Sequence, residues 1–202
     1  MLLRSLRPFV AHPDVAHVAL VLPASDAARP PQWLAELLGG ALGVVAGGSE
    51  RQASVAAGLA SLPEACGVVL VHDAARPFAS AAVIGAVIEC ARAGAAGIAA
   101  VPVSDTLKLT GADGHTVERT VPREGLWRAQ TPQGFPRAML AAAHAASASH
   151  ADGSGAATDD AALVERNGGS VTIVPDSATN FKITTPDDLA LAEAWARAGA
   201  GP

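Results

Sequence analysis

Short apolar runs alternate along the chain with longer stretches whose apolar residues recur at helical spacing. The runs are rich in Val, Ile and Leu and are bounded by Gly, Pro or Asp, which is typical of buried strands. They cover Val15–Leu22, Leu42–Ala46, Gly67–Val71, Gly97–Val103 and Ser170–Val174. The helical stretches cover Pro31–Leu38, Glu50–Leu62, Ser80–Ala95, Pro136–Ala146 and Pro186–Ala198. This alternation predicts an α/β fold with a mostly parallel sheet, flanking helices and right-handed crossovers.

The chain opens with a helical pattern over Leu2–Ala11 that leads to the strand at Val15, and no strand pattern precedes it. A doubly wound domain normally opens with a strand and a loop that carry ligand chemistry. We therefore expect this sequence to open part-way through its fold.

Residues Ser104–Ala129 break the alternation. Thr, Val, Lys and Arg recur there in a two-stranded pattern, with a turn at Gly111–Gly114 and a second break at Pro122. This pattern predicts a β-arm, about residues 104–129, that projects from the domain. The sequence contains no repeat or linker, so we expect one domain over residues 1–202.

Composition and charge narrow the class of protein. Half of the 202 residues are hydrophobic and only 3% are aromatic, so the core must be built from Ala, Val, Leu and Ile. The formal net charge of −5 argues against a nucleic-acid partner, which requires a dense Lys and Arg surface. No apolar stretch approaches the roughly 20 residues of a membrane span. Cys66 and Cys90 lack further ligands at metal-binding spacing, so we interpret them as buried thiols of a cytoplasmic protein.

Familiar phosphate and metal motifs are absent from the sequence. It contains neither G-x-x-x-x-G-K-[ST] nor G-x-G-x-x-G after a strand, and its six histidines lack ligand spacing. What remains is a set of polar clusters that follow predicted strands, where open α/β sheets bind ligands.

The first cluster, Gly47–Ser54, directly follows a strand and opens a helix. Its glycines let a ligand approach the backbone closely, and Ser49 with Gln52 fits a capping box. An ordinary glycine-rich turn before a capped helix would explain the same residues.

The second cluster, His72–Pro77, follows the strand that ends at Val71. An Asp at a strand end can hold a sugar hydroxyl or help to hold a metal ion. The alternative is an Asp–Arg pair that stabilises the loop. We favour a functional role for Asp73 and a structural role for Arg76.

Lysine is rare, because Lys108 and Lys182 are the only two in the chain. Lys182 lies just before a predicted helix start, with Thr185 as the cap and Pro186 as the first helical residue. A compact ammonium group there could meet a phosphate at the edge of the sheet, and a solvated lysine is the ordinary alternative.

The arm and one later helix start hold the remaining candidates. Arg123 offers a bidentate fork for phosphate, whereas Leu126 and Trp127 are better explained by dimer packing. Thr158 and the two aspartates after it open a helix, where capping and charge–dipole complementarity suffice as an explanation.

Taken in order, these clusters resemble the 2-C-methyl-D-erythritol 4-phosphate cytidylyltransferase family. The motifs are G-G-S-E-R-x-x-S, V-H-D-A-A-R-P, P-V-S-D-T-L-K, T-V-P-R-E-G-L-W-R-A-Q-T-P-Q-G-F, A-T-D-D-A and N-F-K-I-T-T-P-D-D-L, and the resemblance runs from about residue 1 to residue 198. It implies a Rossmann-like nucleotidyltransferase fold and a homodimer formed through the arm. It also implies Mg²⁺-dependent transfer of CMP from CTP to 2-C-methyl-D-erythritol 4-phosphate. The products would be 4-diphosphocytidyl-2-C-methyl-D-erythritol, an intermediate of non-mevalonate isoprenoid synthesis, and pyrophosphate.

The resemblance also implies roles for individual residues. Gly48, Ser49 and Ser54 would line the cytosine pocket. Asp73 would contact the erythritol hydroxyls and lie near the metal ion, and Ala74 would lie against the ribose.

Other residues would contact phosphate groups. Thr106 and Arg123, reaching from the partner subunit, would hold the phosphate end of the substrate, with Thr158 nearby. Lys182 would stabilise the charge that grows on the α-phosphate. No general base is needed, because the attacking phosphate oxygen is already anionic, and positioning with electrostatic stabilisation suffices.

Members of the family open with a strand and a Gly-rich loop that contains Arg and a following Pro-Lys and cradles the triphosphate. This sequence begins at about the next helix, so we expect that it starts at an internal Met and that it transfers little or no CMP without that loop. Two alternatives remain open. One is a ribitol-5-phosphate cytidylyltransferase of the same fold, and the other is a catalytically inactive homologue that acts as a binding or dimer module.

Overall fold

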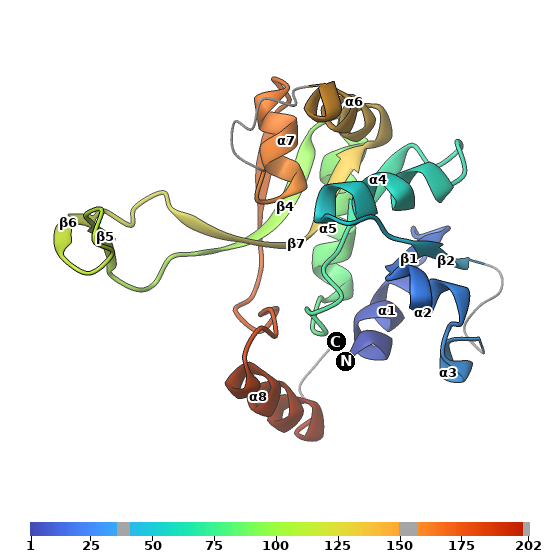
Figure 1. Ribbon diagram of the computed structural model, residues 1–202, viewed down its shortest axis with the longest axis horizontal. Coiled ribbons are helices and arrows are strands. Elements are labelled where there is room, and N and C mark those ends of the chain that lie inside the picture. The colour runs from blue at the N-terminus through green and yellow to red at the C-terminus, as the bar shows by residue number, and fades with distance from the viewer. Residues whose placement is uncertain (36–40, 150–156, 200–202) are drawn as a thin grey trace.

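The centre of the computed structural model is a four-stranded sheet (Figure 1). Its strands, in spatial order, are β3 (Val68–Val71), β7 (Trp127–Pro136), β4 (Ala96–Pro102) and β8 (Val171–Pro175). β4 and β8 are parallel, whereas β7 runs antiparallel to both β3 and β4. Three of the four strands therefore point the same way, as the alternation predicted, and β7 is reversed. The structure describes residues 1–35, 41–149 and 157–199.

β7 is the strand of this sheet that the hydrophobic pattern did not predict. Its middle residues Gln130, Thr131, Gln133 and Gly134 are polar or small, yet all four are buried. The polar side chains are tolerated there because each makes hydrogen bonds. The predicted end of the arm at Ala129 is therefore too late, since the chain is already part of β7 from Trp127 onward.

β1 (Val18–Leu22) and β2 (Leu42–Ala46) form a separate parallel sheet. Within the described ranges β1 pairs only with β2 and β3 only with β7, so each has one edge without a strand partner. A cavity of about 750 Å³ is lined by residues of the strands β1 and β3 and of three helices, α1 (Leu2–Val10), α4 (Arg51–Ser61) and α5 (Ala81–Arg92). The molecule is thus open between the β1–β2 sheet and the central sheet.

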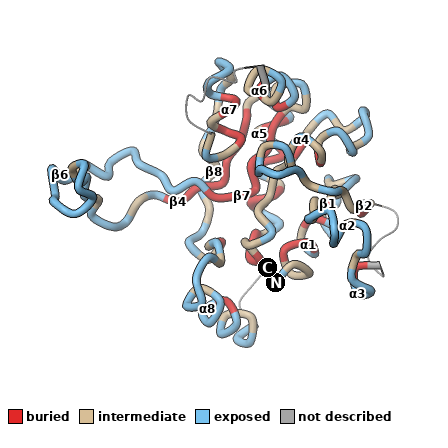
Figure 2. Tube along the Cα trace, viewed as in Figure 1, coloured by how far each residue is buried: buried red, intermediate tan, exposed pale blue. Residues whose placement is uncertain are grey.

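Helices cover both faces of the central sheet, with α5 (Ala81–Arg92) on one and α6 (Arg137–Ser149) and α7 (Asp160–Arg166) on the other. α6 and α7 pack against Val69 and Phe135, which are partners in the β3–β7 register. Figure 2 shows that buried residues gather where these helices meet the sheet. The core is mainly aliphatic, as the composition predicted.

A registered pair of glycines, Gly97 and Gly134, lets α5 lie close to the sheet. A Cβ atom at Gly134 would be 2.5 Å from Val87 Cγ1, and one at Gly97 would be 2.7 Å from Cys90 Cβ. Neither distance is compatible with ordinary van der Waals contact, so a side chain at either position would push the helix away.

The remaining helices are α2 (Ala24–Ala28), α3 (Gln32–Ala35) and α8 (Pro186–Arg197). α8 begins with the predicted cap, because the Thr185 hydroxyl accepts from the Asp188 N–H and the Asp188 carboxylate accepts from the Thr185 N–H. α3 confirms the start of the helix expected over Pro31–Leu38, and residues 36–38 lie outside the described residues. α2 was not predicted. In the described parts of the chain, no helix is long and apolar enough to cross a membrane.

β5 (Leu107–Thr110) and β6 (Val117–Val121) form an antiparallel hairpin at the tip of a long arm (Figure 1). This confirms the two-stranded pattern and its turn, which the Asp113 carboxylate stabilises by accepting from the backbone N–H groups of His115 and Thr116. Most of the arm is exposed (Figure 2). Large apolar side chains exposed on it are Leu109, Val117, Leu126 and Trp127.

Candidate active site

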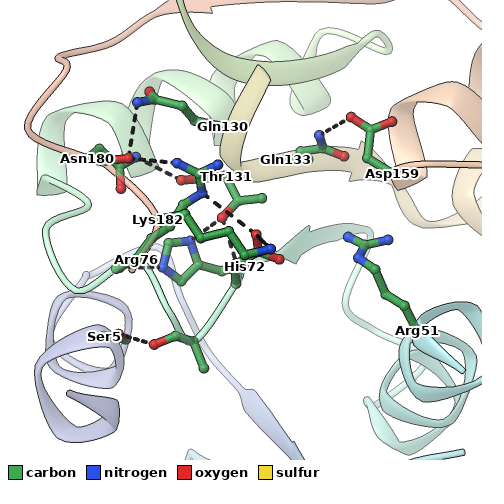
Figure 3. A network of polar contacts seen from close by, with 12 residues as sticks. Ser5, Arg51, His72, Arg76, Gln130, Thr131, Gln133, Asp159, Asn180 and Lys182 are labelled. Carbon is green, nitrogen blue, oxygen red and sulfur yellow. Dashed lines mark hydrogen bonds and ion pairs between the residues drawn. The ribbon is translucent and has the colours of Figure 1, made fainter. Parts of the chain in front are cut away.

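The candidate site centres on Asp73, in the loop that follows β3. Lys182 Nζ lies 3.0 Å from Asp73 Oδ2, and Arg76 Nε lies 3.7 Å from the same oxygen (Figure 3). Lys182 comes from the segment between β8 and α8, far along the chain. The fold thus brings together the two residues that the sequence singled out as a catalytic cation and a ligand-binding carboxylate.

The charges around Asp73 decide its protonation. Burial acts to raise the pKa of the Asp73 carboxyl, but the hydrogen bond from Lys182 and the charges of Lys182, Arg51 and Arg76 hold it below its usual value. Burial also lowers the pKa of Arg76, and the neighbouring Asp73 carboxylate offsets part of that effect. Asp73 is therefore ionised at neutral pH and faces cations on several sides.

A partly buried chain of hydrogen bonds holds the Asp73 backbone in place. The Asp73 N–H donates to Thr131 Oγ1 over 3.0 Å, and the Thr131 hydroxyl lies 3.0 Å from His72 Nδ1. His72 Nε2 lies 3.0 Å from the Arg76 carbonyl oxygen. Burial lowers the pKa of His72 to about 4. The imidazole is therefore neutral near pH 7, with Nε2 donating to Arg76 and Nδ1 accepting from Thr131.

Asn180 fixes the Lys182 segment against this loop. Its side-chain amide donates to the Thr131 carbonyl over 2.8 Å and to Asp176 Oδ2 over 2.7 Å. The backbone carbonyl of Asn180 accepts from Arg76 Nη1 over 2.8 Å and from Gln130 Nε2 over 3.0 Å. Because Asn180 is buried and bonds both to β7 and to the loop that contains Asp73 and Arg76, it fixes the position of the backbone next to Lys182.

Arg76 therefore has a structural role, as the sequence favoured, and it also lies within the charged group. It bridges Asp73 and the Asn180 carbonyl. Ala74 is exposed, and its carbonyl accepts from Ser5 Oγ of α1 over 2.7 Å. Ala74 thus ties the Asp73 loop to α1 while its small side chain leaves space at the cavity.

The Gly47–Ser54 segment contributes Arg51 and Ser54 to the lining of the same cavity. Ser54 Oγ accepts from the Gly48 N–H over 3.2 Å and donates to the Glu50 carbonyl over 3.0 Å. A Cβ atom at Gly48 would be 2.4 Å from Ala53 Cβ, so glycine is required there by packing alone. Ser49 is exposed, and Ser54 lines the same cavity as Asp73.

The predicted capping box of α4 is wrong. The N-cap residue is Glu50, not Ser49, and no side chain caps the helix. The turn is stabilised instead by Ser54, which bonds back to the loop from within the helix.

Thr106 and Arg123 lie on the projecting arm, where both are exposed. Arg123 donates to the Ser104 carbonyl, which ties the two limbs of the arm together. Among the residues that the structure describes, no hydrogen bond or ion pair joins either of them to Asp73. Thr158 is exposed just before α7, whose N-cap is Asp159. One chain therefore assembles the Asp73–Lys182 group without its predicted arm residues.

Sequence reasoning missed several polar residues of the site, including Thr131 and Asn180. It also assigned no role to Arg51, which extends from the start of α4 beside the Asp73 group (Figure 3). Arg51 forms an ion pair with the buried Asp160, with 2.7 Å between Nη2 and Oδ2. Arg51 does lie within the G-G-S-E-R-x-x-S motif, which was the one available signal for it.

No cluster of three or more His, Cys, Asp or Glu side chains that could hold a metal occurs within residues 1–35, 41–149 and 157–199. Mg²⁺, however, is usually held by one or two carboxylates together with substrate phosphates. Asp73 supplies one ionised carboxylate at the cavity. The residues present therefore fit a Mg²⁺ ion that is bound jointly with a nucleotide.

The arrangement suits transfer of a phosphoryl-type group. Such reactions depend mainly on positioning and on cations that face the developing negative charge. Lys182 and Arg51 supply such cations at the site, and Asp73 supplies an acceptor for hydroxyl groups.

Comparisons with known proteins point to the same family that the sequence motifs resemble. The family model for 2-C-methyl-D-erythritol 4-phosphate cytidylyltransferase (IspD) matches residues 1–198. The 2-C-methyl-D-erythritol 4-phosphate cytidylyltransferase of Salinibacter ruber is 47% identical over 196 residues, which cover 96% of this chain and 80% of that protein. The bifunctional enzyme IspD/IspF of Anaeromyxobacter dehalogenans is 48% identical over 207 residues, which cover 100% of this chain and 52% of that longer protein.

Solved structures agree with the sequence comparison. The crystal structure of 2-C-methyl-D-erythritol 4-phosphate cytidylyltransferase from Thermus thermophilus has a TM-score of 0.82 at 42% identity, covering 98% of this chain and 89% of its own. The 4-diphosphocytidyl-2C-methyl-D-erythritol synthase of Anaerococcus prevotii has a TM-score of 0.86 at 28% identity, covering 97% and 85%. The Rossmann-like nucleotidyltransferase fold is thereby confirmed, and the chain belongs to the 2-C-methyl-D-erythritol 4-phosphate cytidylyltransferase family.

Proposed function

We propose that this protein transfers CMP from CTP to 2-C-methyl-D-erythritol 4-phosphate and releases pyrophosphate, as a step of isoprenoid precursor synthesis. The observation that carries the proposal is the Asp73–Lys182 pair, 3.0 Å apart, at the cavity beside the end of β3. Asp73 belongs to the V-H-D-A-A-R-P motif and Lys182 to the N-F-K-I-T-T-P-D-D-L motif. Thr131 accepts from the Asp73 N–H, and Asn180, two residues before Lys182, donates to the Thr131 carbonyl.

In the proposed reaction, a phosphate oxygen of the polyol substrate attacks the α-phosphorus of CTP. A new P–O bond forms there, the bond to the β-phosphate breaks, and pyrophosphate leaves with the electron pair. The nucleophile is already anionic, so the protein does not have to remove a proton. Its task is to align the two phosphates and to neutralise the charge that grows between them.

Lys182 neutralises charge on the α-phosphate in this scheme. Its pairing with Asp73, which lines the cavity, holds the ammonium group in place before the substrates arrive, so little reorganisation is needed when charge develops. Asp73 accepts hydrogen bonds from hydroxyls of the polyol. A Mg²⁺ ion held by Asp73 and the nucleotide phosphates would supply further neutralisation of phosphate charge.

Gly48, Ser49 and Ser54 form the proposed cytosine pocket, and Ala74 the proposed ribose contact. Support comes from the positions of Ser54 and Ala74, since both line the cavity that Asp73 also lines. The backbone at Gly48 is held close to α4, since a Cβ atom there would be 2.4 Å from Ala53 Cβ.

The proposed active form is a homodimer in which the arm of one subunit completes the site of the other. The arm exposes Leu109, Val117, Leu126 and Trp127, four large apolar side chains that a partner subunit would cover. Thr106 and Arg123 would then bind the phosphate end of the polyol from the partner subunit, with Thr158 nearby. A cytoplasmic location remains a prediction.

The proposal is tested by measuring pyrophosphate release with CTP and Mg²⁺ and each of two polyol phosphates. We expect release with 2-C-methyl-D-erythritol 4-phosphate and much less with ribitol 5-phosphate. High protein concentrations and long incubations allow for slow turnover, and an Asp73→Asn variant serves as the matched control. Preference for ribitol 5-phosphate would favour that substrate, and CTP binding without any release would favour the non-catalytic module.

A further inference from the structure

A fully buried carboxylate lies behind the site, at the first residue of α7. Asp160 has no exposed side-chain surface, and two groups reach it from other helices. Arg51 Nη2 of α4 lies 2.7 Å from Asp160 Oδ2, and His144 Nε2 of α6 lies 2.9 Å from Asp160 Oδ1. A buried carboxylate without such partners destabilises the fold, so the ion pair with Asp160 fixes the position of the Arg51 side chain.

The ion pair with Asp160 does not engage all of the N–H donors of Arg51. Its side chain is 38% exposed, and a guanidinium group has five N–H donors, of which the Asp160 contact occupies only part. Arg51 also lines the cavity that contains Asp73, whereas Asp160 does not. The charge of Arg51 is close enough to Asp73 to help lower the pKa of that carboxyl. The carboxylate partner of Arg51 therefore lies behind it, and donors remain for a ligand in front.

The other cations of the site are engaged differently. Lys182 and Arg76 both pair with Asp73, which itself lines the cavity, and Arg76 also donates to the buried Asn180 carbonyl. An incoming anion must compete with Asp73 for these two groups. At Arg51 it meets a cation whose own carboxylate partner is buried outside the cavity.

We propose that Arg51 binds a phosphate group of the substrates, and that Asp160 and His144 position it for this contact. The planar fork of a guanidinium group matches a phosphate with two parallel hydrogen bonds. Arg51 belongs to the segment that also carries Gly48 and Ser54, so a phosphate of the nucleotide is its expected ligand. This inference rests on the proposed function, because that function supplies the phosphates.

Removal of Arg51 alone would leave Asp160 charged and without its cation in the interior. The test therefore uses the double variant Arg51→Gln/Asp160→Asn, in which both charges are removed and the amide can still accept from His144. Asp160→Asn alone is the matched control, because it keeps the cation and loses only its anchor. Melting temperatures of all variants are measured first. We expect the double variant to melt near the wild-type temperature and Arg51→Gln well below it.

Binding of CTP, of cytidine and of 2-C-methyl-D-erythritol 4-phosphate is then measured by calorimetry. In the double variant we expect CTP to bind about 10- to 100-fold more weakly, as for the loss of a charged hydrogen bond. Cytidine has no phosphate, so its affinity should change less than about twofold, and Asp160→Asn should weaken CTP binding only a few-fold. Weakening of the polyol phosphate instead of CTP would keep the phosphate contact and move it to the other substrate.

Unchanged affinities for both phosphate ligands in the double variant would overturn the proposal. If the double variant has no cooperative melting transition, Arg51→Lys is measured in its place. Lysine keeps a cation beside Asp160 but lacks the planar fork of a guanidinium group. Wild-type CTP affinity in Arg51→Lys would then overturn the contact of two parallel hydrogen bonds. Failure of the proposed function is distinguishable. A wild-type protein that binds CTP through Arg51 but releases no pyrophosphate would refute the transfer reaction alone, and one that binds neither phosphate would refute both.

Discussion

At the scale of single residues, the proposed reaction depends on the contact between Lys182 and Asp73, whose charged atoms lie 3.0 Å apart. A cation that meets growing charge contributes mainly in the transition state. Lys182→Ala should therefore lower kcat by about 10²–10³, the range for loss of one electrostatic stabiliser, and weaken CTP binding far less. Steady-state kinetics together with calorimetric CTP titration would check this. Unchanged turnover would remove Lys182 from the mechanism.

His72 gives a prediction for the pH dependence of stability. The pKa of His72 falls from 6.5 to about 4 on folding because the side chain is buried. Between these two pH values the unfolded chain therefore binds a proton at His72 that the folded protein does not bind. Stability should therefore be lost as the pH falls from about 6.5 toward 4. Between pH 7 and pH 4.5, this one group should account for about 2–3 kcal/mol of the decrease.

Urea unfolding at pH 7 and at pH 4.5 would measure this effect. We expect His72→Gln to show a smaller decrease in the free energy of unfolding than the wild type, whereas His115→Gln, at an exposed histidine of the arm, should follow the wild type. Equal decreases for all three proteins would mean that His72 titrates normally in the fold.

Part of the site was predictable at this scale. Asp73 and Lys182 follow from the rule that open α/β sheets bind ligands at strand ends, combined with the scarcity of lysine. Thr131, Asn180 and Asp160 were not predictable as site residues, because their importance comes from burial among polar partners. Burial of a polar side chain depends on tertiary packing, which no local pattern of the sequence expresses.

At the scale of elements, the close contact between α5 and the sheet depends on two glycines. Gly134→Ala would place a methyl group 2.5 Å from Val87 Cγ1, so the helix or the strand must move. We expect a loss of about 1–3 kcal/mol in the free energy of unfolding, the range for an overpacked core. Gly43→Ala in β2 is the matched control, since nothing lies within 4 Å of the added atom. Urea unfolding would compare them, and equal stability would show that α5 can shift freely.

The elements with strong hydrophobic patterns were predicted well. The apolar runs correspond to five observed strands, and their bounds differ by a few residues at most; these strands are β1, β2, β3, β4 and β8. α8 has the predicted cap. β7 escaped prediction because its buried middle is made of Gln, Thr and Gly, whose burial is compensated by hydrogen bonds to other segments. The reversed direction of β7 also follows from the arm, which returns the chain to the sheet from the far end of β4.

At the scale of the whole molecule, the proposed site needs two subunits. Arg123 lies on a projecting, exposed arm, so we expect it to serve the site of the partner. Mixing an Arg123→Ala chain with an Asp73→Ala chain should then restore activity, because one of the two sites in the mixed dimer carries both intact residues. Each variant alone, as a homodimer, provides the control.

Tagged chains purified in two affinity steps would isolate that mixed dimer. Activity up to about half of the wild-type value per dimer is expected, while both parent variants remain nearly inactive. If a verified mixed dimer recovers nothing, each arm serves its own site, and the proposed assembly is incorrect.

The most direct test of the central claim is ³¹P NMR of the protein incubated with CTP, Mg²⁺ and 2-C-methyl-D-erythritol 4-phosphate. We expect the CTP resonances to decline while pyrophosphate and a diphosphate-linked cytidine–polyol product appear in equal amounts. CTP that stays intact over long incubations at high protein concentration, or pyrophosphate that appears without the linked product, would contradict the proposed reaction.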